Sequence, residues 1–266
     1  MDFFRAVIAS KEISRRVLSL TKRVITLNAA NYTAWHLRRT CLYQLGMNLQ
    51  DELTYTAQCA ENNPKNYQIW YHRKALVEKI GDGSKEPQFV SQIMSETDSK
   101  NYHAWAHRQW AIQAFNLWEG ELEYSDHLIR QDVRNNSAWN HRWFVLNRGG
   151  KLPCIDDATA KREIAYAQNQ AELAISNECP FNYLRAVGAK SNIKISSDPI
   201  FEWLKSKLAT TTVTAVALRS LMIDALAERN DVQVALSMCM ELANQYDTIR
   251  KDYWRWRGDV LAEKAN

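Results

Sequence analysis

Residues 65–73 read KNYQIWYHR and residues 100–108 read KNYHAWAHR, so one pattern returns after 35 positions. Each copy has an asparagine, a tryptophan four residues later and an arginine three residues after the tryptophan. Two further copies keep these three residues, and the four tryptophans are separated by 35, 35 and 34 residues. The copies begin at Asn31, Asn66, Asn101 and Asn135, and their tryptophans are Trp35, Trp70, Trp105 and Trp139.

Weaker copies continue the pattern toward the C-terminus. Phe181 takes the place of the tryptophan after Asn177, Trp254 is followed by Arg257, and the interval between them leaves room for one degenerate unit near Leu218. A period in the mid-thirties is typical of stacked helical hairpins, each of which buries its apolar face against its neighbours. The sequence therefore predicts an all-α fold of about seven hairpins, a tetratricopeptide-like right-handed α-α superhelix with a crescent shape. We expect residues 1–266 to form a single repeat domain.

The second helix of each hairpin is predicted to begin at the repeated asparagine. An asparagine side chain is a good N-cap because its oxygen accepts a hydrogen bond from an amide of the first turn. The tryptophan then occupies the fourth helical position and packs between repeats. Residues 149–157 are expected to form the longest loop. The first helices are predicted at residues 10–28, 48–62, 86–98, 117–132, 158–177, 198–208 and 229–246.

Composition narrows the class of protein. The formal net charge is +4, from 34 Lys+Arg and 30 Asp+Glu, which is too small to indicate a nucleic-acid or anionic membrane surface. Five scattered cysteines without a C-x-x-C pair predict reduced thiols. The sequence has neither an eighteen-residue apolar run nor a secretory signal at its start. We expect a cytoplasmic protein without a membrane span.

The amino ends of the second helices are the candidate functional edge. Free amides and the positive end of the helix dipole favour anions there. The residue before the capping asparagine is basic in three copies, and tyrosine follows the cap in three copies. The next position holds Gln68 or His103 in two of them. This basic ladder predicts a phosphate or carboxylate site and consists of Lys65, Lys100 and Arg134 with Tyr32, Tyr67 and Tyr102.

No self-sufficient active site is visible in the sequence. Glycine-rich phosphate loops, the G-x-S-x-G motif and the H-E-x-x-H motif are all missing, and we expect no metal site in this chain. Three histidines two residues after a tryptophan are predicted to belong to the repeat architecture. They are His72, His107 and His141.

The repeated N-Y-x-x-W-x-x-R motif resembles the repeat of protein prenyltransferase α subunits. The segments MDFFRAV, LNAANYTAWHLRR, KNYQIWYHRK, KNYHAWAHRQW, DVRNNSAWNHRWFV and YDTIRKDYWRWRGDVL look like the α subunit shared by protein farnesyltransferase and type I geranylgeranyltransferase. The resemblance extends over almost the whole chain.

This resemblance implies a heterodimer with a β subunit that holds the catalytic Zn²⁺, with Mg²⁺ needed for farnesyl transfer. The reaction moves a farnesyl or geranylgeranyl group from its diphosphate to the cysteine of a C-terminal CaaX tail. Lys65, Tyr67 and His103 match family positions at the diphosphate, with Asn101 as a neighbouring candidate. Gln68 matches the glutamine that binds the peptide carboxylate, and Tyr32 matches a tyrosine of the pocket for the last residue.

Two other interpretations remain open at this point. A Rab geranylgeranyltransferase α subunit has a similar repeat, another β partner and often additional domains. A tetratricopeptide-like scaffold would have no enzymatic partner, but its W-x-x-L-G-x-x-Y pattern is not seen here. Neither interpretation explains the DFFRAV opening and the KNYQ unit as well as the shared α subunit does.

Overall fold

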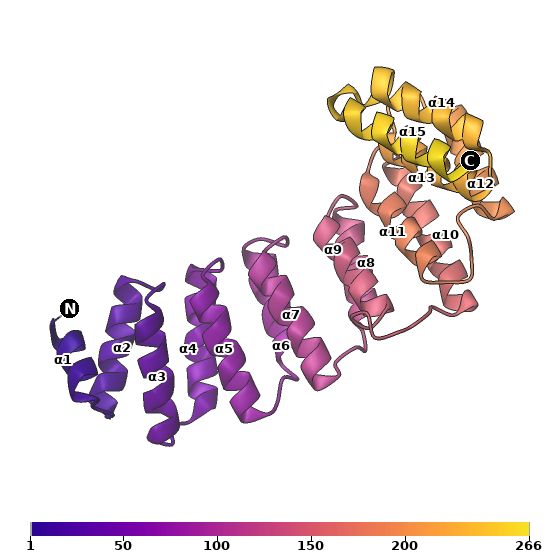
Figure 1. The fold of residues 1–266 in the computed structure, drawn as a ribbon. Helices are drawn as coiled ribbons and strands as arrows, with labels where there is room; N and C mark the ends of the chain where they lie inside the picture. The colour runs from indigo at the N-terminus through magenta and orange to yellow at the C-terminus, as the bar shows by residue number, and fades with distance from the viewer. Residues whose placement is uncertain (1, 266) are drawn as a thin grey trace. The chain divides into compact units, whose positions relative to one another are not determined.

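The computed structural model describes residues 2–265, which form helices and contain no β-strand (Figure 1). Contacts between residues divide the chain into two units, one ending at Glu119 and the other starting at Gly120. In the first unit, α1 precedes three hairpins formed by α2–α3, α4–α5 and α6–α7. The helices of this unit are α1 (Asp2–Ser10), α2 (Arg15–Leu27), α3 (Tyr32–Gln44), α4 (Leu49–Asn62), α5 (Tyr67–Ile80), α6 (Glu86–Glu96) and α7 (Tyr102–Phe115).

The second unit contains four hairpins, α8–α9, α10–α11, α12–α13 and α14–α15. A π-helical turn (Leu242–Tyr246) and a 3-10 turn (Thr248–Arg250) connect the last two helices. Seven hairpins agree with the sequence, so the predicted all-α fold of stacked hairpins is confirmed. The helices are α8 (Glu121–Gln131), α9 (Asn136–Leu146), α10 (Asp157–Leu173), α11 (Glu178–Ala189), α12 (Asp198–Thr210), α13 (Val216–Glu228), α14 (Val232–Glu241) and α15 (Lys251–Ala265). The assignment of all 266 residues to one domain stays a prediction.

The repeated asparagines and tryptophans have the predicted structural roles. Each asparagine accepts a hydrogen bond from an amide of the helix that it caps, as Asn66 Oδ1 does from the Gln68 amide at 2.9 Å. Each tryptophan Nε1 donates to the backbone carbonyl six residues before it, as Trp70 does to Pro64 at 2.7 Å. These bonds fix the loop between the two helices of a hairpin. The other caps are Asn31, Asn101, Asn135 and Asn177, and the other tryptophans are Trp35, Trp105 and Trp139.

The degenerate repeats keep the packing although they lose the motif. Phe181 and Leu218 occupy the repeat position that holds a tryptophan in the first four repeats. Both are fully buried in the core of the second unit. Trp254 is 2% exposed and donates from Nε1 to Asp247 at 2.7 Å. The strong and weak repeats therefore share a buried apolar side chain at this position. Its burial stabilises the fold by about 1.5–3 kcal/mol for each residue.

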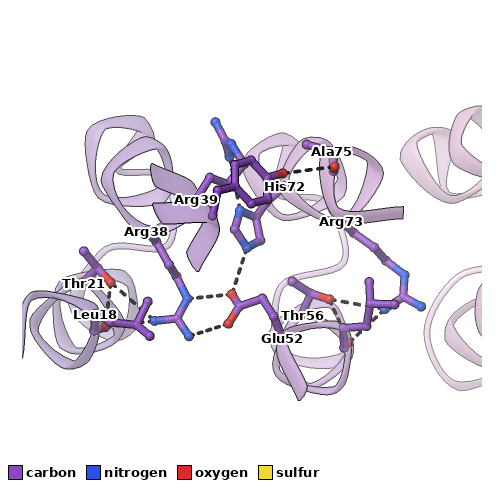
Figure 2. Close-up of polar contacts among 11 residues, drawn as sticks. Leu18, Thr21, Arg38, Arg39, Glu52, Thr56, His72, Arg73 and Ala75 are labelled. Carbon is purple, nitrogen blue, oxygen red and sulfur yellow. Dashed lines mark hydrogen bonds and ion pairs between the residues drawn. The ribbon is translucent and has the colours of Figure 1, made fainter. Parts of the chain in front are cut away.

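Buried ion-pair networks join neighbouring hairpins within each unit, and Figure 2 shows the one between α2–α3 and α4–α5. Arg38 of α3 binds both carboxylate oxygens of Glu52 of α4, with two nitrogen–oxygen distances of 2.6 Å. His72 of α5 places Nε2 2.8 Å from the same carboxylate. Arg38 also donates to the Leu18 carbonyl in α2 at 3.0 Å. One arginine therefore connects its own hairpin to the following one.

The same network recurs along the chain. Arg73 binds both oxygens of Glu86 at 2.7 and 2.8 Å, and His107 Nε2 lies 2.7 Å from that carboxylate. In the second unit His141 Nε2 lies 2.7 Å from Glu121. A final version there joins Arg142 to Glu163 at 2.8 and 3.0 Å and replaces the histidine with Tyr183. The prediction that His72, His107 and His141 belong to the repeat architecture is therefore confirmed.

The predicted start of the first helix, at residue 10 of the range 10–28, is wrong, because α2 begins at Arg15. The chain leaves α1 at Ser10, and Lys11 adopts a positive φ of 54°. Ser14 then caps α2 by accepting a hydrogen bond from the Val17 amide at 3.3 Å. The Glu12 carboxylate accepts from the Ser14 hydroxyl at 2.6 Å. These local bonds compete with the helix and separate α1 from α2. The other six predicted first helices overlap α4, α6, α8, α10, α12 and α14.

We expect the buried networks to make stability fall on acidification between about pH 7 and pH 5. Burial lowers the pKa of His72 and of His107, despite their hydrogen bonds to glutamate. The unfolded chain therefore takes up protons on these histidines before the folded chain does, which favours unfolding. Burial raises the pKa of Glu52 and Glu86, but bonds from histidine and arginine lower it by more. Stability should fall further when the pH drops below the usual pKa of glutamate, because the unfolded chain then protonates these carboxylates before the folded chain does.

Urea midpoints measured at pH 7.5, 6.5 and 5.5 check this expectation. A His72→Gln variant should lose part of the dependence between pH 7.5 and 5.5, because glutamine does not titrate. An exposed-histidine control, His36→Gln, should keep the wild-type dependence. A midpoint that is constant with pH, or equal slopes in all three proteins, would contradict it.

Candidate functional site

All six predicted site residues lie in the first unit. The amino ends of α3, α5 and α7 carry them, in the order of the chain. Each of these ends is held by a capping asparagine, so the first-turn side chains start from a fixed backbone. Figure 1 shows the three helices following one another within this unit.

Tyr32 and Gln68 line one pocket of about 310 Å³ between the amino-terminal parts of α3 and α5. Tyr32 is 71% exposed at its rim. The Gln68 side chain has no hydrogen-bond partner among residues 2–265, so its amide is available to a ligand. The complete lining is Tyr32, His36, Arg39, Tyr67, Gln68 and Tyr71.

Tyr67 connects this pocket to the neighbouring helix end. It lines the pocket, and its ring centroid lies 6.2 Å from that of His103, the second residue of α7, with the planes at 61°. The Tyr67 ring also stacks on Tyr71 at 6.1 Å. More than half of the Tyr67 side chain is exposed, and His103 is half-buried. A phenol and an imidazole, both hydrogen-bond donors, are therefore brought together at the surface.

Lys65 lies at the same end of α5 and is 77% exposed. Its Nζ stands 3.8 Å from Asp98 Oδ2, in the connection that leads into α7. An exposed ion pair of this length contributes little to stability, so Lys65 can exchange Asp98 for a bound anion at small cost. Lys100 and Arg134 of the predicted ladder are also exposed, and Arg134 belongs to the second unit.

Asn101 differs from the other predicted site residues because it is buried. Its Oδ1 accepts from the His103 and Ala104 amides at 2.9 and 3.3 Å, and its Nδ2 donates to the Pro64 carbonyl at 2.9 Å. The side chain thus holds the start of α7 against the loop before α5. A direct contact of Asn101 with substrate stays a prediction.

Sequence reasoning missed His36, Arg39 and Tyr71, which complete the pocket. A signal existed in the repeat itself. At four positions after the tryptophan the four copies carry different residues, so this position is not fixed by repeat packing. The residues there are Arg39, Lys74, Gln109 and Trp143.

The chemistry of this edge is that of hydrogen-bond donation to anions. Among the described residues, the pocket lining contains no aspartate or glutamate, and the Arg39 cation lies beside phenols, an imidazole and an amide. Lys65 adds a second cation at the neighbouring amino end of α5. Among residues 2–265, no three His, Cys, Asp or Glu side chains are grouped as ligands of a metal ion. Neither a nucleophile nor a metal centre is therefore assigned to this edge.

Other features agree with the sequence. The five cysteines form no disulfide within the described residues. No helix within residues 2–265 has the length and apolar character needed to cross a membrane.

Comparisons with known proteins all match this chain to protein prenyltransferases. The model of the protein prenyltransferase alpha subunit repeat matches residues 14–45, 49–80, 84–115 and 118–149. The protein farnesyltransferase/geranylgeranyltransferase type-1 subunit alpha of Pisum sativum is 38% identical over 291 residues, covering 100% of this chain and 86% of the relative. Its counterpart in Dictyostelium discoideum is 37% identical and covers 99% of this chain and 84% of the relative.

A solved structure gives the same result for the fold. A chain of the Candida albicans protein geranylgeranyltransferase-I complexed with GGPP superimposes with a TM-score of 0.88 and 28% sequence identity. The match covers 97% of this chain and 88% of that chain.

Proposed function

Because the chain belongs to the protein prenyltransferase α-subunit family, we propose that it pairs with a β subunit to form a protein farnesyltransferase or type I geranylgeranyltransferase. The heterodimer transfers a farnesyl or geranylgeranyl group from its diphosphate to the cysteine of C-terminal CaaX tails. The main support is identity near 38% over the full chain with α subunits of that name. This chain is inactive alone and stabilises the β subunit.

The edge formed by Lys65, Tyr67 and His103 receives the diphosphate. Negative charge grows on the diphosphate as the bond to the isoprenoid breaks, and donors directed at it stabilise that charge most in the transition state. Lys65 supplies a mobile ammonium group, and Tyr67 and His103 supply donors 6.2 Å apart by ring centroid. Asn101 positions His103 by accepting its backbone amide.

The pocket beside this edge receives the end of the peptide. Gln68 offers a free amide to the C-terminal carboxylate, and Tyr32 contacts the last side chain. Tyr67 lies between the two sites, which suits a reaction in which peptide and isoprenoid meet.

The metals belong outside this chain. Its described residues do not provide a metal centre, so we assign the catalytic Zn²⁺, and Mg²⁺ for farnesyl transfer, to the β subunit and the bound diphosphate. The five scattered cysteines, which form no disulfide within the described residues, support a cytoplasmic location.

Co-expression with farnesyl-type and geranylgeranyl-type β subunits tests the function. We expect a stable heterodimer that transfers isoprenoid to a CaaX peptide, with the β subunit deciding between the two diphosphates. Pairing without transfer would support a scaffold. Transfer only to Rab proteins with an escort protein would indicate the Rab enzyme instead.

We expect Gln68→Ala to weaken peptide binding about tenfold and to leave the chemical step nearly unchanged. The reason is that the amide contacts the carboxylate equally in the ground state and the transition state. Peptide KM and single-turnover rate, measured in the heterodimer, separate these effects. Gln50→Ala, an exposed glutamine on α4, is the control and should change neither. Unchanged peptide affinity in Gln68→Ala would reject the assignment.

A further inference from the structure

We infer that the pocket between α3 and α5 is a carboxylate subsite in which the Arg39 guanidinium supplies the charge and His72 holds it in place. This inference rests on the proposed function and deepens it, because it adds a charged partner for the peptide carboxylate to the neutral amide of Gln68.

Arg39 is a cation without a counter-ion in the described part of the chain. It lines the pocket, and its guanidinium lies 5.0 Å from the centroid of the Tyr71 ring. No ion pair joins it to an aspartate or glutamate among residues 2–265. Burial lowers the pKa of Arg39, which reflects the loss of water around the uncompensated charge. An anion that enters the pocket would compensate it.

Other basic residues at this part of the repeat do have carboxylate partners, so the lack of a carboxylate beside Arg39 is not a requirement of the fold. Arg38 donates two hydrogen bonds to the Glu52 carboxylate, and this ion pair belongs to the packing between repeats. The residue equivalent to Arg39 in the next repeat, Lys74, has Glu78 at 3.9 Å and lies over the Trp110 ring. Arg39 is therefore free of the partners that occupy comparable side chains.

His72 lies between Arg39 and Glu52, as Figure 2 shows, and holds the Arg39 guanidinium through its ring. Arg39 Nη1 lies 3.2 Å from His72 Nδ1, while His72 Nε2 lies 2.8 Å from Glu52. Since guanidinium only donates and carboxylate only accepts, the neutral ring carries its proton on Nε2 and accepts at Nδ1. The buried network between hairpins thus sets the tautomer that orients a pocket residue.

The charge of the pocket selects a monoanion. One guanidinium lies among neutral donors from Tyr32, Tyr67 and Gln68, and no acidic side chain from residues 2–265 lines the pocket. A planar guanidinium binds a carboxylate through two parallel hydrogen bonds. A diphosphate carries more charge than one arginine balances, and Lys65 and His103 lie at the adjoining edge to receive it.

The test compares two CaaX peptides that differ only at the C-terminus, one with a free carboxylate and one with a carboxamide. Binding of each is measured by fluorescence anisotropy to the wild-type heterodimer and to Arg39→Gln, in the presence of a non-transferable isoprenoid diphosphate analogue. We expect Arg39→Gln to bind the carboxylate peptide about tenfold more weakly and the carboxamide peptide as the wild type does.

Two further variants sharpen the result. Arg39→Lys should keep part of the carboxylate preference, because it retains the charge but not the planar fork. Lys74→Gln removes the equivalent cation of the next repeat and should leave the preference unchanged. Glutamine at position 39 can still donate to His72 Nδ1, so thermal unfolding should show that the variant folds.

The inference is overturned if Arg39→Gln weakens both peptides equally, which indicates packing or β-subunit contact. Loss of affinity for the diphosphate analogue alone would assign the charge to phosphate and overturn it as well. Transfer by the wild type is measured separately. Absence of transfer would reject the proposed function, while the binding comparison still decides the role of Arg39.

Discussion

Replacing Lys65 by alanine should lower kcat by about 10- to 100-fold in the reconstituted heterodimer, because a charge-assisted contact formed mainly in the transition state is lost. In the structure Lys65 contributes little to folding, so the substitution tests its role in the reaction. Lys65 is 77% exposed, and its only ion pair, among residues 2–265, is the 3.8 Å contact with Asp98. Folding and β-subunit binding should therefore be unaffected. A single-turnover measurement with saturating substrates reports the chemical step.

An exposed lysine of the second unit provides the control. Lys205 pairs with Glu202 at 3.2 Å on the surface of α12, and Lys205→Ala should leave the rate unchanged. Zinc content should be equal in all three proteins. A single-turnover rate of Lys65→Ala equal to that of the wild type would reject a role for this lysine at the leaving group.

Removing one buried carboxylate should have the largest effect on stability. Glu86→Ala is expected to lower the free energy of unfolding by about 3–5 kcal/mol, since it leaves the Arg73 guanidinium buried without a counter-ion. The His107 Nε2 would also lose its partner. Arg73 would keep its hydrogen bonds to Leu53 and Thr56 of α4 and its contact with the Phe89 ring, none of which carries a negative charge. Urea denaturation followed by circular dichroism measures the loss.

A glutamate on the outer face of α5 serves as the matched control. Glu78 pairs with Lys74 at 3.9 Å and is about half exposed, so Glu78→Ala should cost less than about 1 kcal/mol. Hydrogen exchange of the amides in α6 and α7 should accelerate selectively in Glu86→Ala, because neighbouring repeats stabilise one another. Equal destabilisation by the two substitutions would contradict the structural role of the network.

The candidate site was partly readable in the sequence. Lys65, Tyr67, Gln68 and His103 could be placed at helix ends because the repeat fixes the position of every cap. The structure adds that Tyr67 faces both the pocket and His103. It also shows that Asn101 is buried, which gives that residue a structural explanation. The variation at the repeat position of Arg39 could mark this residue as outside repeat packing, but the sequence does not tell an arginine with a carboxylate partner from one without.

The sequence by itself determined the asparagine caps, the second helices that follow them and the number of hairpins, because these depend on residues within one or two turns and return with a period near 35. Only the tertiary structure decided which carboxylate meets which arginine. The paired residues are 14, 13 and 21 positions apart in Arg38–Glu52, Arg73–Glu86 and Arg142–Glu163. Loop lengths change that interval while the contact between adjacent helices stays the same, so spatial packing selects these partners.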